Sequence, residues 1–427
     1  MVKKPSQAVI LAAGANTRFW PLGKEKHKAM YEILGKPILH YTLEELKQCG
    51  IKEVVMVVSP HDASIQSYVG NGKKFGIRIQ YAIQQNPLGM GDAVLAAKHH
   101  LQDLFFVLNA SSINCAEVIK PMLALFQKCP TSILVATPTK QPWLYGIFQL
   151  QGNKVLSIAE KPKQGTEPSN LRVVGVYLLP KDLIPFLENI PASDDSFEQA
   201  ITAYARENPV YAVTLKNLAT FSLKYPWHLF AISKYLMDRF LKRGISKKAK
   251  ISKKAVIEGN VAIGDNTRVM DYAIIKGPCT IGSNCMIGNN TLIRQYSSIG
   301  DNCMVGHDTE IKNSIIYDDV HFHKNFFGES IVDDGCRFGA GTITANRRLD
   351  RQTVKTVVKG EKIDTGMDFF GTICGRNVKT GINTSIMPGI KIGNGCIIGP
   401  NTNLLEDVED NATLYAEFKQ MVKKKND

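Results

Sequence analysis

The tetrapeptide Gly264-Asp265-Asn266-Thr267 recurs as Gly282-Ser283-Asn284-Cys285 and again as Gly300-Asp301-Asn302-Cys303, each time 18 residues further along the chain. The same spacing returns downstream between Gly375-Arg376-Asn377-Val378 and Gly393-Asn394-Gly395-Cys396. Within a period, apolar residues return about every six positions, and three six-residue turns make one coil of a triangular parallel β-helix. Each coil buries aliphatic side chains against its neighbours, while Gly, Asn and Asp suit corners that need positive φ. The repeats therefore predict an all-β solenoid in the C-terminal half of the chain.

The N-terminal half has another pattern, in which short apolar runs alternate with amphipathic stretches. Such alternation predicts an α/β domain, with a mostly parallel sheet and helices on both faces. Ligands of such sheets bind beyond the carboxyl ends of the strands, which is where Gly14 falls. We expect strands at Ala8–Ala13, Glu53–Ser59, Ile77–Ile83, Phe105–Asn109 and Ser132–Thr137, and helices at Leu39–Cys49 and Asp92–Leu101.

Charge and cysteine content narrow the class of protein. The net charge of +13 gathers in Lys242–Lys254 and Lys423–Lys425 without interleaved aromatic residues. This distribution favours a solvated linker and a solvated tail over a nucleic-acid-binding surface. Alternatively, these basic residues attract anionic small molecules such as sugar phosphates and coenzyme A. The nine cysteines form no CxxC pair, and four share one repeat position (Cys285, Cys303, Cys336 and Cys396), which favours reduced thiols and a cytoplasmic protein. No apolar run approaches the ~20 residues that span a bilayer, so no membrane association is expected.

Several motifs of the N-terminal half follow one another in a fixed order. The first is Leu11-Ala12-Ala13-Gly14-Ala15-Asn16-Thr17-Arg18, with Lys28 after it. Backbone amides of a Gly-rich turn can cradle a phosphate, and Arg18 and Lys28 add positive charge. The later motifs are Gln84 with Pro87-Leu88-Gly89-Met90-Gly91, then Tyr145-Gly146, then Glu160-Lys161-Pro162. Over roughly residues 7–235, this set resembles the sugar nucleotidyltransferases.

The resemblance implies a Rossmann-like fold that binds a nucleotide or nucleotide sugar and a sugar 1-phosphate. It implies that the nucleotide is bound by Gly14, Arg18, Lys28, Gln84 and Gly89. It implies that the sugar phosphate is bound by Gly146, Glu160 and Lys161. Asn16 stands at the motif's second glycine, and asparagine tolerates positive φ better than most side chains.

Two serines stand where the family has metal-binding aspartates. The stretch that should read Leu-Asn-Gly-Asp ends in Ser111, and Ser222 replaces the aspartate of a later Trp-x-Asp segment. Nucleotidyl transfer has an anionic transition state that a divalent cation neutralises, and magnesium prefers carboxylate oxygens to a serine hydroxyl. We therefore expect no metal site at these positions and impaired nucleotidyl transfer. In the alternative, nucleotidyl transfer survives because other residues, such as Asp92, and substrate phosphates hold the magnesium.

Motifs of the C-terminal half carry a second resemblance. They are His323-Lys324-Asn325-Phe326-Phe327-Gly328-Glu329-Ser330, Gly339-Ala340-Gly341-Thr342-Ile343-Thr344-Ala345-Asn346 and Lys379-Thr380-Gly381-Ile382-Asn383-Thr384-Ser385-Ile386-Met387-Pro388-Gly389. They resemble the acetyltransferase half of bifunctional enzymes, of an archaeal type, that acetylate glucosamine 1-phosphate and then uridylylate it. Hexapeptide-repeat acyltransferases of this kind form left-handed parallel β-helices. The two resemblances together cover nearly the whole chain.

This second resemblance implies acetyl-CoA as donor and an amino-sugar 1-phosphate as acceptor. His323 would be the general base, Asn346 would orient the amino sugar, Lys355 would hold its phosphate, and the backbone amide of Ala340 would contact the acetyl thioester. A base is needed because an amino sugar arrives protonated and only the free amine attacks a thioester, and imidazole titrates near the working pH. Such enzymes bind their substrates between adjacent β-helices, so a homotrimer is expected.

Two departures favour a non-enzymatic alternative. Phe326 stands where the family has a tyrosine, and Gln352 replaces one lysine of a pair. In this alternative the chain is a regulatory or scaffolding paralogue that binds sugar nucleotides and partners an active homologue. His323 would then be a structural or merely exposed histidine.

We expect four segments along the chain. A nucleotidyltransferase-like domain spans residues 1–240, and a helical connector lies within Ser222–Arg243. A basic linker follows at 241–254, then a left-handed β-helix at 255–410 and a C-terminal tail at 411–427.

Overall fold

The computed structural model describes residues 4–60 and 62–422. Contacts between Cα atoms divide the chain into two compact units. The first unit comprises Met1–Asn16, Glu25–Glu32 and Lys36–Ser222, and the second comprises Thr17–Lys24, Ile33–Gly35 and Leu223–Asp427. The short segment Thr17–Lys24 thus groups with the C-terminal part of the chain. The basic residues Lys423–Lys425 lie outside the described residues.

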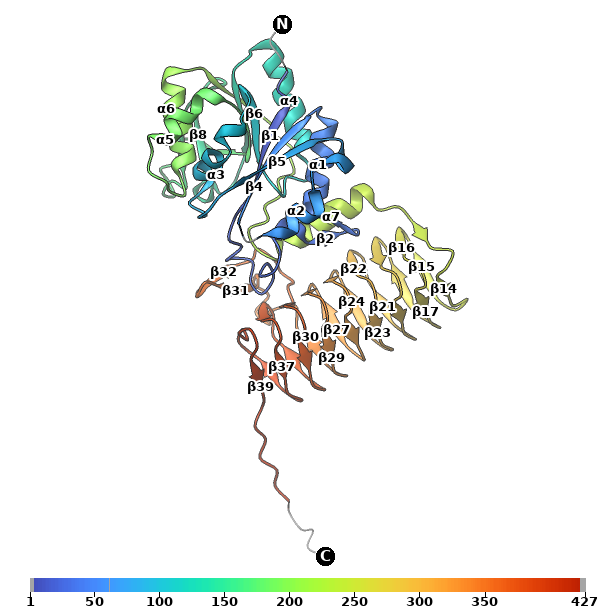
Figure 1. Ribbon diagram of the computed structural model, residues 1–427. Helices are drawn as coiled ribbons and strands as arrows, with labels where there is room; N and C mark the ends of the chain where they lie inside the picture. The colour runs from blue at the N-terminus through green and yellow to red at the C-terminus, as the bar shows by residue number, and fades with distance from the viewer. Residues whose placement is uncertain (1–3, 61, 423–427) are drawn as a thin grey trace, which may run out of the picture. The chain divides into compact units, whose positions relative to one another are not determined.

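A ten-stranded mixed sheet forms the centre of the first unit (Figure 1). Its strands, in spatial order, are β10 (Leu171–Val173), β8 (Gly146–Gln151), β9 (Lys154–Glu160), β12 (Val210–Thr214), β7 (Ser132–Pro138), β11 (Val176–Pro180), β6 (Leu104–Asn109), β1 (Gln7–Ala12), β4 (Glu53–Val58) and β5 (Arg78–Ile83). The strands β6, β1, β4 and β5 run parallel, as do β7 and β12, whereas β8 to β11 add antiparallel pairs. The five strands expected from the sequence are present, with ends that shift by at most one residue.

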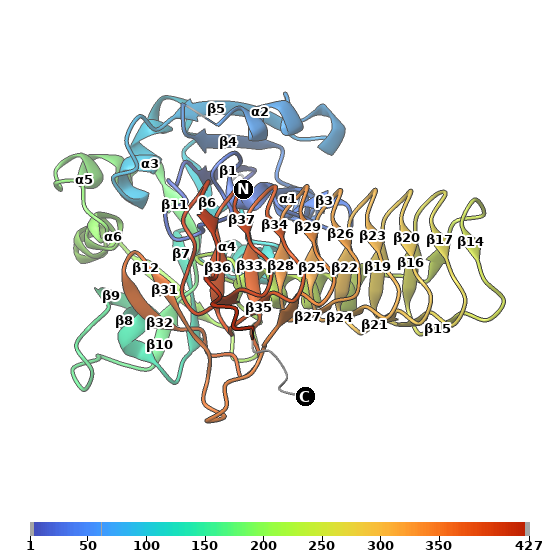
Figure 2. The ribbon, with the colours of Figure 1, turned by 90° about the horizontal axis from the view of Figure 1, so that it is seen from below.

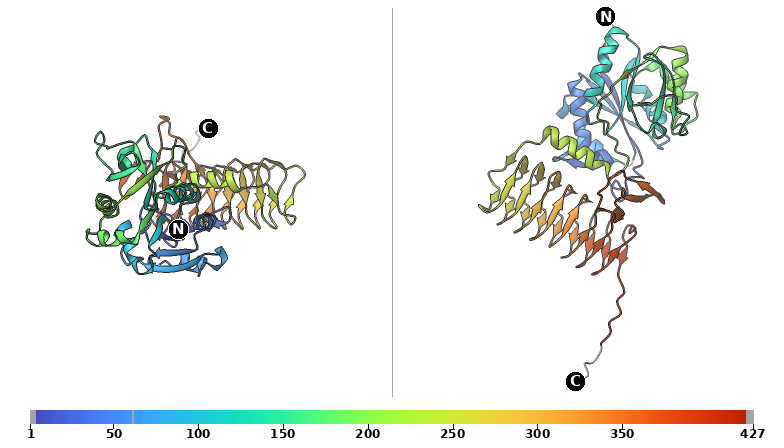
Figure 3. Two further views of the ribbon diagram at one scale, coloured as in Figure 1. Left: turned by 90° about the horizontal axis from the view of Figure 1, so that it is seen from above. Right: turned by 180° about the vertical axis from the view of Figure 1, so that it is seen from behind.

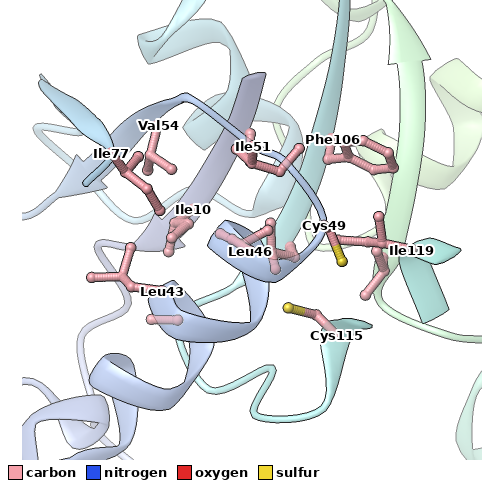
Figure 4. Close-up of a cluster of buried hydrophobic side chains, with 14 of the residues drawn as sticks. Ile10, Leu43, Leu46, Cys49, Ile51, Val54, Ile77, Phe106, Cys115 and Ile119 are labelled. Atoms are coloured by element: carbon pink, nitrogen blue, oxygen red, sulfur yellow. The ribbon is translucent and has the colours of Figure 1, made fainter. Parts of the chain in front are cut away.

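Helices cover both faces of this sheet, as the alternating pattern predicted. They are α1 (Ile38–Gln48), α2 (Ala63–Val69), α3 (Met90–Ala96), α4 (Cys115–Lys128), α5 (Ile184–Glu188) and α6 (Ser196–Glu207). One apolar cluster joins α1 and α4 to the sheet, and Figure 4 shows Leu43, Leu46 and Ile119 of these helices beside Ile10 and Phe106. A second cluster packs α3, α5 and α6 on the other face. The expected helix Asp92–Leu101 ends earlier, because the chain tightens into a 3₁₀ turn at Lys98–His100.

The second unit is a parallel β-helix whose coils contribute strands to three sheets (Figure 2). One sheet contains β13 (Gly244–Ile245), β16 (Val261–Ile263), β19 (Cys279–Ile281), β22 (Ser297–Ile299), β25 (Ile315–Ile316), β28 (Ile331–Val332), β33 (Thr372–Cys374) and β36 (Ile390–Ile392). The next contains β14 (Lys250–Ile251), β17 (Arg268–Val269), β20 (Met286–Ile287), β23 (Met304–Val305), β26 (His321–Phe322), β29 (Arg337–Phe338), β34 (Lys379–Thr380), β37 (Ile397–Ile398) and β39 (Thr413–Leu414). The third contains β15 (Val256–Glu258), β18 (Ile274–Lys276), β21 (Leu292–Ile293), β24 (Glu310–Lys312), β27 (Phe326–Gly328), β30 (Ile343–Thr344), β35 (Ser385–Ile386) and β38 (Asn403–Leu404).

The repeat corners explain why this sequence forms a solenoid. Asn266, Asn284 and Asn302 have φ values of 58°, 57° and 57°, so each repeat asparagine occupies a left-handed corner, as expected. Aliphatic and cysteine side chains stack inside the coils, where Phe322 and Phe327 are fully buried. The two units are therefore an α/β unit and a parallel β-helix, as expected. Figure 3 shows the stack of coils from two other sides.

Two segments flank or leave the regular coils. The expected connector helix is α7 (His228–Phe240), which packs its Phe230 against Phe370 of the β-helix. A hairpin of β31 (Lys355–Val358) and β32 (Glu361–Asp364) is inserted between two coils. Near the N-terminus, β2 (Glu32–Ile33) and β3 (Lys36–Pro37) form a separate two-stranded sheet. The stretch 241–254, expected as a linker, contains β13 and β14, so the first coil begins before residue 255. Within the described ranges, no helix is long and apolar enough to cross a membrane.

Candidate functional sites

Three expected sugar-phosphate residues lie together in the first unit, where β8 and β9 pair. Gly146 lies opposite Glu160 across these antiparallel strands. A Cβ atom on Gly146 would lie 2.8 Å from Glu160 Oε2, so a larger residue here would displace the Glu160 carboxylate. Lys161 follows with a φ of 43°, and its Nζ lies 3.2 Å from Glu160 Oε1. The three residues form one polar corner at the ends of the two strands.

Two residues that the sequence analysis missed lie close to this corner. The Arg172 guanidinium lies 4.4 Å from the centre of the Tyr145 ring and donates a hydrogen bond to Thr220. Burial of Glu198, with a further contribution from the charge of Glu160, raises the pKa of Glu198 to about 7. Both stand outside the family motifs, and Glu198 belongs to the amphipathic pattern of α6, so no sequence signal singled them out.

Gln84 and Gly89 also come together as expected. Gln84 is buried, and its Nε2 donates hydrogen bonds to the Gly89 carbonyl at 3.3 Å and to Asp92 Oδ2 at 2.6 Å. Gly89 has a φ of 111°, and a Cβ there would lie 2.5 Å from the Ser193 carbonyl oxygen. The carboxylate of Asp92, the alternative metal ligand, is therefore already engaged by Gln84.

The Gly-rich loop is divided between the two units. Gly14 and Lys28 belong to the first unit and Arg18 to the second. No atom lies within 4 Å of where a Cβ on Gly14 would stand, so the space beside this glycine is open. Asn16 has a φ of 54°, which is the conformation expected at the motif's second glycine. His27 is buried, its Nδ1 accepts a hydrogen bond from Ala29 N, and burial lowers its pKa to about 4.

Within the second unit, Asp410 anchors the segment Thr17–Lys24. Its Oδ1 accepts from Trp20 Nε1 at 3.1 Å, and its Oδ2 lies 3.1 Å from Lys24 Nζ. Asn394 Nδ2 donates to the Pro21 carbonyl at 3.1 Å. The segment that carries Arg18 is therefore tied to the last coils of the β-helix.

The residues at the expected metal position do not fit magnesium. Ser111, just after β6, is buried, and Ser222 is exposed, so both offer only neutral hydroxyl groups. Throughout the described part of the chain, no three His, Cys, Asp or Glu side chains lie close enough to hold a metal ion. Magnesium prefers carboxylate oxygens, so the hydroxyl groups of these two serines are poor ligands for it.

His323 lies in the turn between β26 and β27 of the second unit. Its backbone is fixed on both sides, because its N–H donates to Asn325 Oδ1 at 2.7 Å and its carbonyl accepts from Thr309 Oγ1 at 3.0 Å. Asn325 is itself buried and donates to the Gly339 carbonyl at 2.9 Å. The imidazole is exposed and has no hydrogen-bond partner among the described residues. A fixed backbone thus presents a free imidazole.

The expected acceptor residue Asn346 lies just after β30. Its Nδ2 donates to Glu329 Oε2 at 2.5 Å, and Lys312 Nζ lies 2.9 Å from Glu329 Oε1. Glu329 stands inside the quoted His323–Ser330 motif but was assigned no role, and Lys312 stands outside the motifs, because the contact between them forms only when the coils stack. A Cβ on Gly328 would lie 2.5 Å from Asn346 Nδ2, so this glycine makes room for the amide.

The other two expected residues of this site lie on neighbouring coils. The Ala340 carbonyl accepts from Asn383 N at 2.8 Å, whereas its own N–H has no partner within the described ranges. Lys355 is exposed at the start of β31, opposite Asp364. No direct contact joins Lys355 to Asn346 or to His323 in the described structure. Phe326 is half-buried and lies beside Gly328.

Comparison with known proteins covers both units. A nucleotidyl transferase family model matches residues 7–225, and a bacterial transferase hexapeptide model matches residues 260–295 and 371–405. The "Bifunctional protein GlmU" of Methanococcus maripaludis is 38% identical over 98% of this chain and 99% of its own length. This chain belongs to the GlmU-like family of bifunctional sugar-1-phosphate nucleotidyltransferase/acetyltransferases.

Further relatives agree with this family. The "Bifunctional sugar-1-phosphate nucleotidylyltransferase/acetyltransferase" of Sulfurisphaera tokodaii is 30% identical over 96% of this chain and 99% of its own length. Among solved structures, a UDP-glucose pyrophosphorylase complexed with UDP-glucose has a TM-score of 0.50 at 23% identity. The match covers 55% of this chain and 99% of the solved chain, and it supports the fold of the first unit.

Proposed function

We propose that the second unit of this GlmU-like chain transfers an acetyl group from acetyl-CoA to an amino-sugar 1-phosphate. The observation that carries the proposal is the exposed, unpartnered imidazole of His323 on a backbone fixed by Asn325 and Thr309. A general base must be accessible to the substrate. The nitrogen that takes the proton must not be engaged in an internal hydrogen bond. A structural histidine would instead be buried and paired, and the activity of His323→Ala distinguishes a general base from a merely exposed histidine.

In this proposal His323 takes a proton from the ammonium group of the acceptor. The free amine nitrogen then attacks the thioester carbonyl carbon, and the oxygen of the tetrahedral intermediate becomes negative. The unpartnered N–H of Ala340 is suited to stabilise that oxygen. The carbon–sulfur bond breaks, coenzyme A leaves as a thiolate that takes up a proton, and an amide remains. Asn346 orients the amine, and Lys355 attracts the phosphate.

We propose a different state for the first unit, which binds a nucleotide sugar or sugar 1-phosphate but transfers nucleotides poorly. Gly146, Glu160 and Lys161 are suited to the sugar phosphate, and Gly14, Arg18, Lys28, Gln84 and Gly89 to the nucleotide. The neutral Ser111 and Ser222 support the impairment, since they leave the developing charge without a metal. Magnesium would serve only a surviving transfer activity.

The second candidate is a regulatory or scaffolding protein, and Phe326 and Gln352 favour it because each replaces a functional side chain of the family. Under either candidate we propose a cytoplasmic homotrimer. All nine cysteines are free thiols, which supports the cytoplasmic assignment.

The test is acetyl-CoA consumption by wild type and His323→Ala with a panel of amino-sugar 1-phosphates. We expect turnover by wild type and a ~10²–10⁴-fold lower kcat in the variant, with an unchanged thermal melt, because a general base contributes about that much. Phe326→Tyr, which restores the family's hydroxyl group, serves as a gain-of-activity comparison. An active wild type with an equally active His323→Ala would eliminate the histidine, and an inactive wild type would favour the regulatory candidate.

A further inference from the structure

Glu329 is a buried carboxylate with both oxygens engaged. Oε2 accepts a hydrogen bond from Asn346 Nδ2 at 2.5 Å, and Oε1 lies 2.9 Å from Lys312 Nζ. The Lys312 ammonium also lies 4.5 Å from the centre of the Phe369 ring. A buried charge is costly unless it is paired, and these two partners supply the pairing. Lys312, Glu329 and Asn346 therefore form one connected polar network around a buried carboxylate.

The carboxylate decides which end of the Asn346 carboxamide faces outward. An ionised carboxylate can only accept hydrogen bonds, so it binds the NH₂ end and excludes the carbonyl end. The Asn346 Oδ1 atom is left pointing elsewhere, and it has no hydrogen-bond partner in the described part of the chain. Neither end is blocked by Gly328, whose missing side chain leaves room for the amide.

This orientation matters for an amine nucleophile. A carbonyl oxygen accepts an N–H of the amine and leaves the nitrogen lone pair free to attack. An NH₂ group in the same place would donate to that lone pair and make the amine a poorer nucleophile. The reaction of an amino sugar therefore requires the orientation that a carboxylate at position 329 enforces.

We propose that Glu329 is a positioning residue that holds the Asn346 carbonyl toward the acceptor amine and so adapts the site to amino sugars. The inference rests on the proposed acetyl transfer. Glu329 acts through Asn346 and touches no reacting atom. Lys312 pairs with the second oxygen of the carboxylate, so only Oε2 is left to bind the Asn346 amide.

The test compares Glu329→Gln with the exchange variant Glu329→Gln/Asn346→Asp. A glutamine at 329 can donate or accept, so Asn346 is free to flip, and we expect kcat for the amino-sugar 1-phosphate to fall ~10–100-fold. The exchange variant again places one amide against one carboxylate and turns an oxygen outward, so it should recover most of the loss. The KM for acetyl-CoA should stay unchanged in both.

Asp265→Asn is the control, because Asp265 forms an exposed pair with Lys248 in the first coils of the same unit, several coils before His323 and Asn346. The change in kcat should be less than twofold, which corresponds to a change of ~0.4 kcal/mol or less in the activation free energy. Asn346→Asp alone is a second test that needs no glutamine at 329. It sets two carboxylates together, so we expect its kcat to fall below that of the exchange variant, in which only one of the two side chains is charged.

The outcomes separate the inference from the proposed function. Without acetyl transfer by wild type, the proposed function fails and this inference fails with it. If wild type is active, an unchanged kcat in Glu329→Gln contradicts the positioning role alone. So does an exchange variant whose kcat is no better than that of Glu329→Gln or of Asn346→Asp.

Discussion

Single residues decide what the first unit of this family member can still do. Asn16 keeps the positive φ of a lost glycine, with a value of 54°, so its substitution preserves the loop. Ser111 and Ser222 are different, because no rearrangement of a hydroxyl group replaces the charge of a carboxylate. Glu160 and Lys161 remain in place beside Gly146, so we expect this unit to bind a sugar phosphate even if it transfers nucleotides slowly.

Restoring both carboxylates should therefore restore nucleotidyl transfer. We expect wild type to form nucleotide sugar at well below ~1 per second with any nucleoside triphosphate and magnesium. Ser111→Asp/Ser222→Asp should be faster than either single variant by more than the two single effects combined, because two ligands act as one metal site. Pyrophosphate release measures the rate. Wild-type turnover in the usual enzyme range would refute the impairment.

His27 should make the protein sensitive to acid. Its folded pKa of about 4 lies below the usual 6.5, so the unfolded chain binds the proton more tightly. The stability contribution is complete above about pH 6.5 and is lost as pH falls toward 4, by about 2 kcal/mol at about pH 5. Thermal melts at about pH 7 and pH 5 should show this loss in wild type and a smaller loss in His27→Gln. Equal losses would contradict the assignment.

The elements that carry these residues differ in how far the sequence predicts them. The coils were predictable because a corner such as Asn284 and a core position such as Ile287 recur every 18 residues. The first coil was hidden, since lysines mask its pattern in 241–254. Motif residues such as Gly146 and Glu160 could be predicted because the family motifs follow a fixed order along the chain. The roles of Glu198, Glu329 and Lys312 could not, because they depend on burial and on contacts with neighbouring strands.

The segment Thr17–Lys24 is a case that local sequence cannot reveal, because its anchor Asp410 lies hundreds of residues away. Asp410→Ala removes the acceptor of Trp20 and the partner of Lys24. We expect trypsin to cut after Arg18 and Lys24 about tenfold faster in this variant, since charged hydrogen bonds contribute about that much.

Asp265→Ala is the control for this cleavage experiment. Asp265 forms an exposed pair with Lys248 in the first coils, and exposed pairs contribute little to stability. Its cleavage pattern should match wild type. If Asp410→Ala is cut no faster than this control, the anchor does not hold the segment.

The whole chain is expected to act as a homotrimer through residues 250–410. The β-helix exposes apolar side chains such as Val256, Ile274 and Ile343 along its third sheet. Head-to-tail contacts of one such face close into a ring under cyclic symmetry. Light scattering should therefore give three times 47.2 kDa. A mass of one chain at micromolar concentration would count against the trimer.

One incubation tests both proposals together, because the second unit is proposed to transfer acetyl groups and the first unit is proposed to transfer nucleotides poorly. Purified protein is mixed with glucosamine 1-phosphate or galactosamine 1-phosphate, acetyl-CoA, a nucleoside triphosphate and magnesium, and the products are followed by mass spectrometry. We expect the N-acetylated sugar 1-phosphate to accumulate with wild type and to form ~10²–10⁴-fold more slowly with His323→Ala, while nucleotide sugar stays near background. Rapid formation of nucleotide sugar, or the absence of any acetylated product, would contradict the proposals.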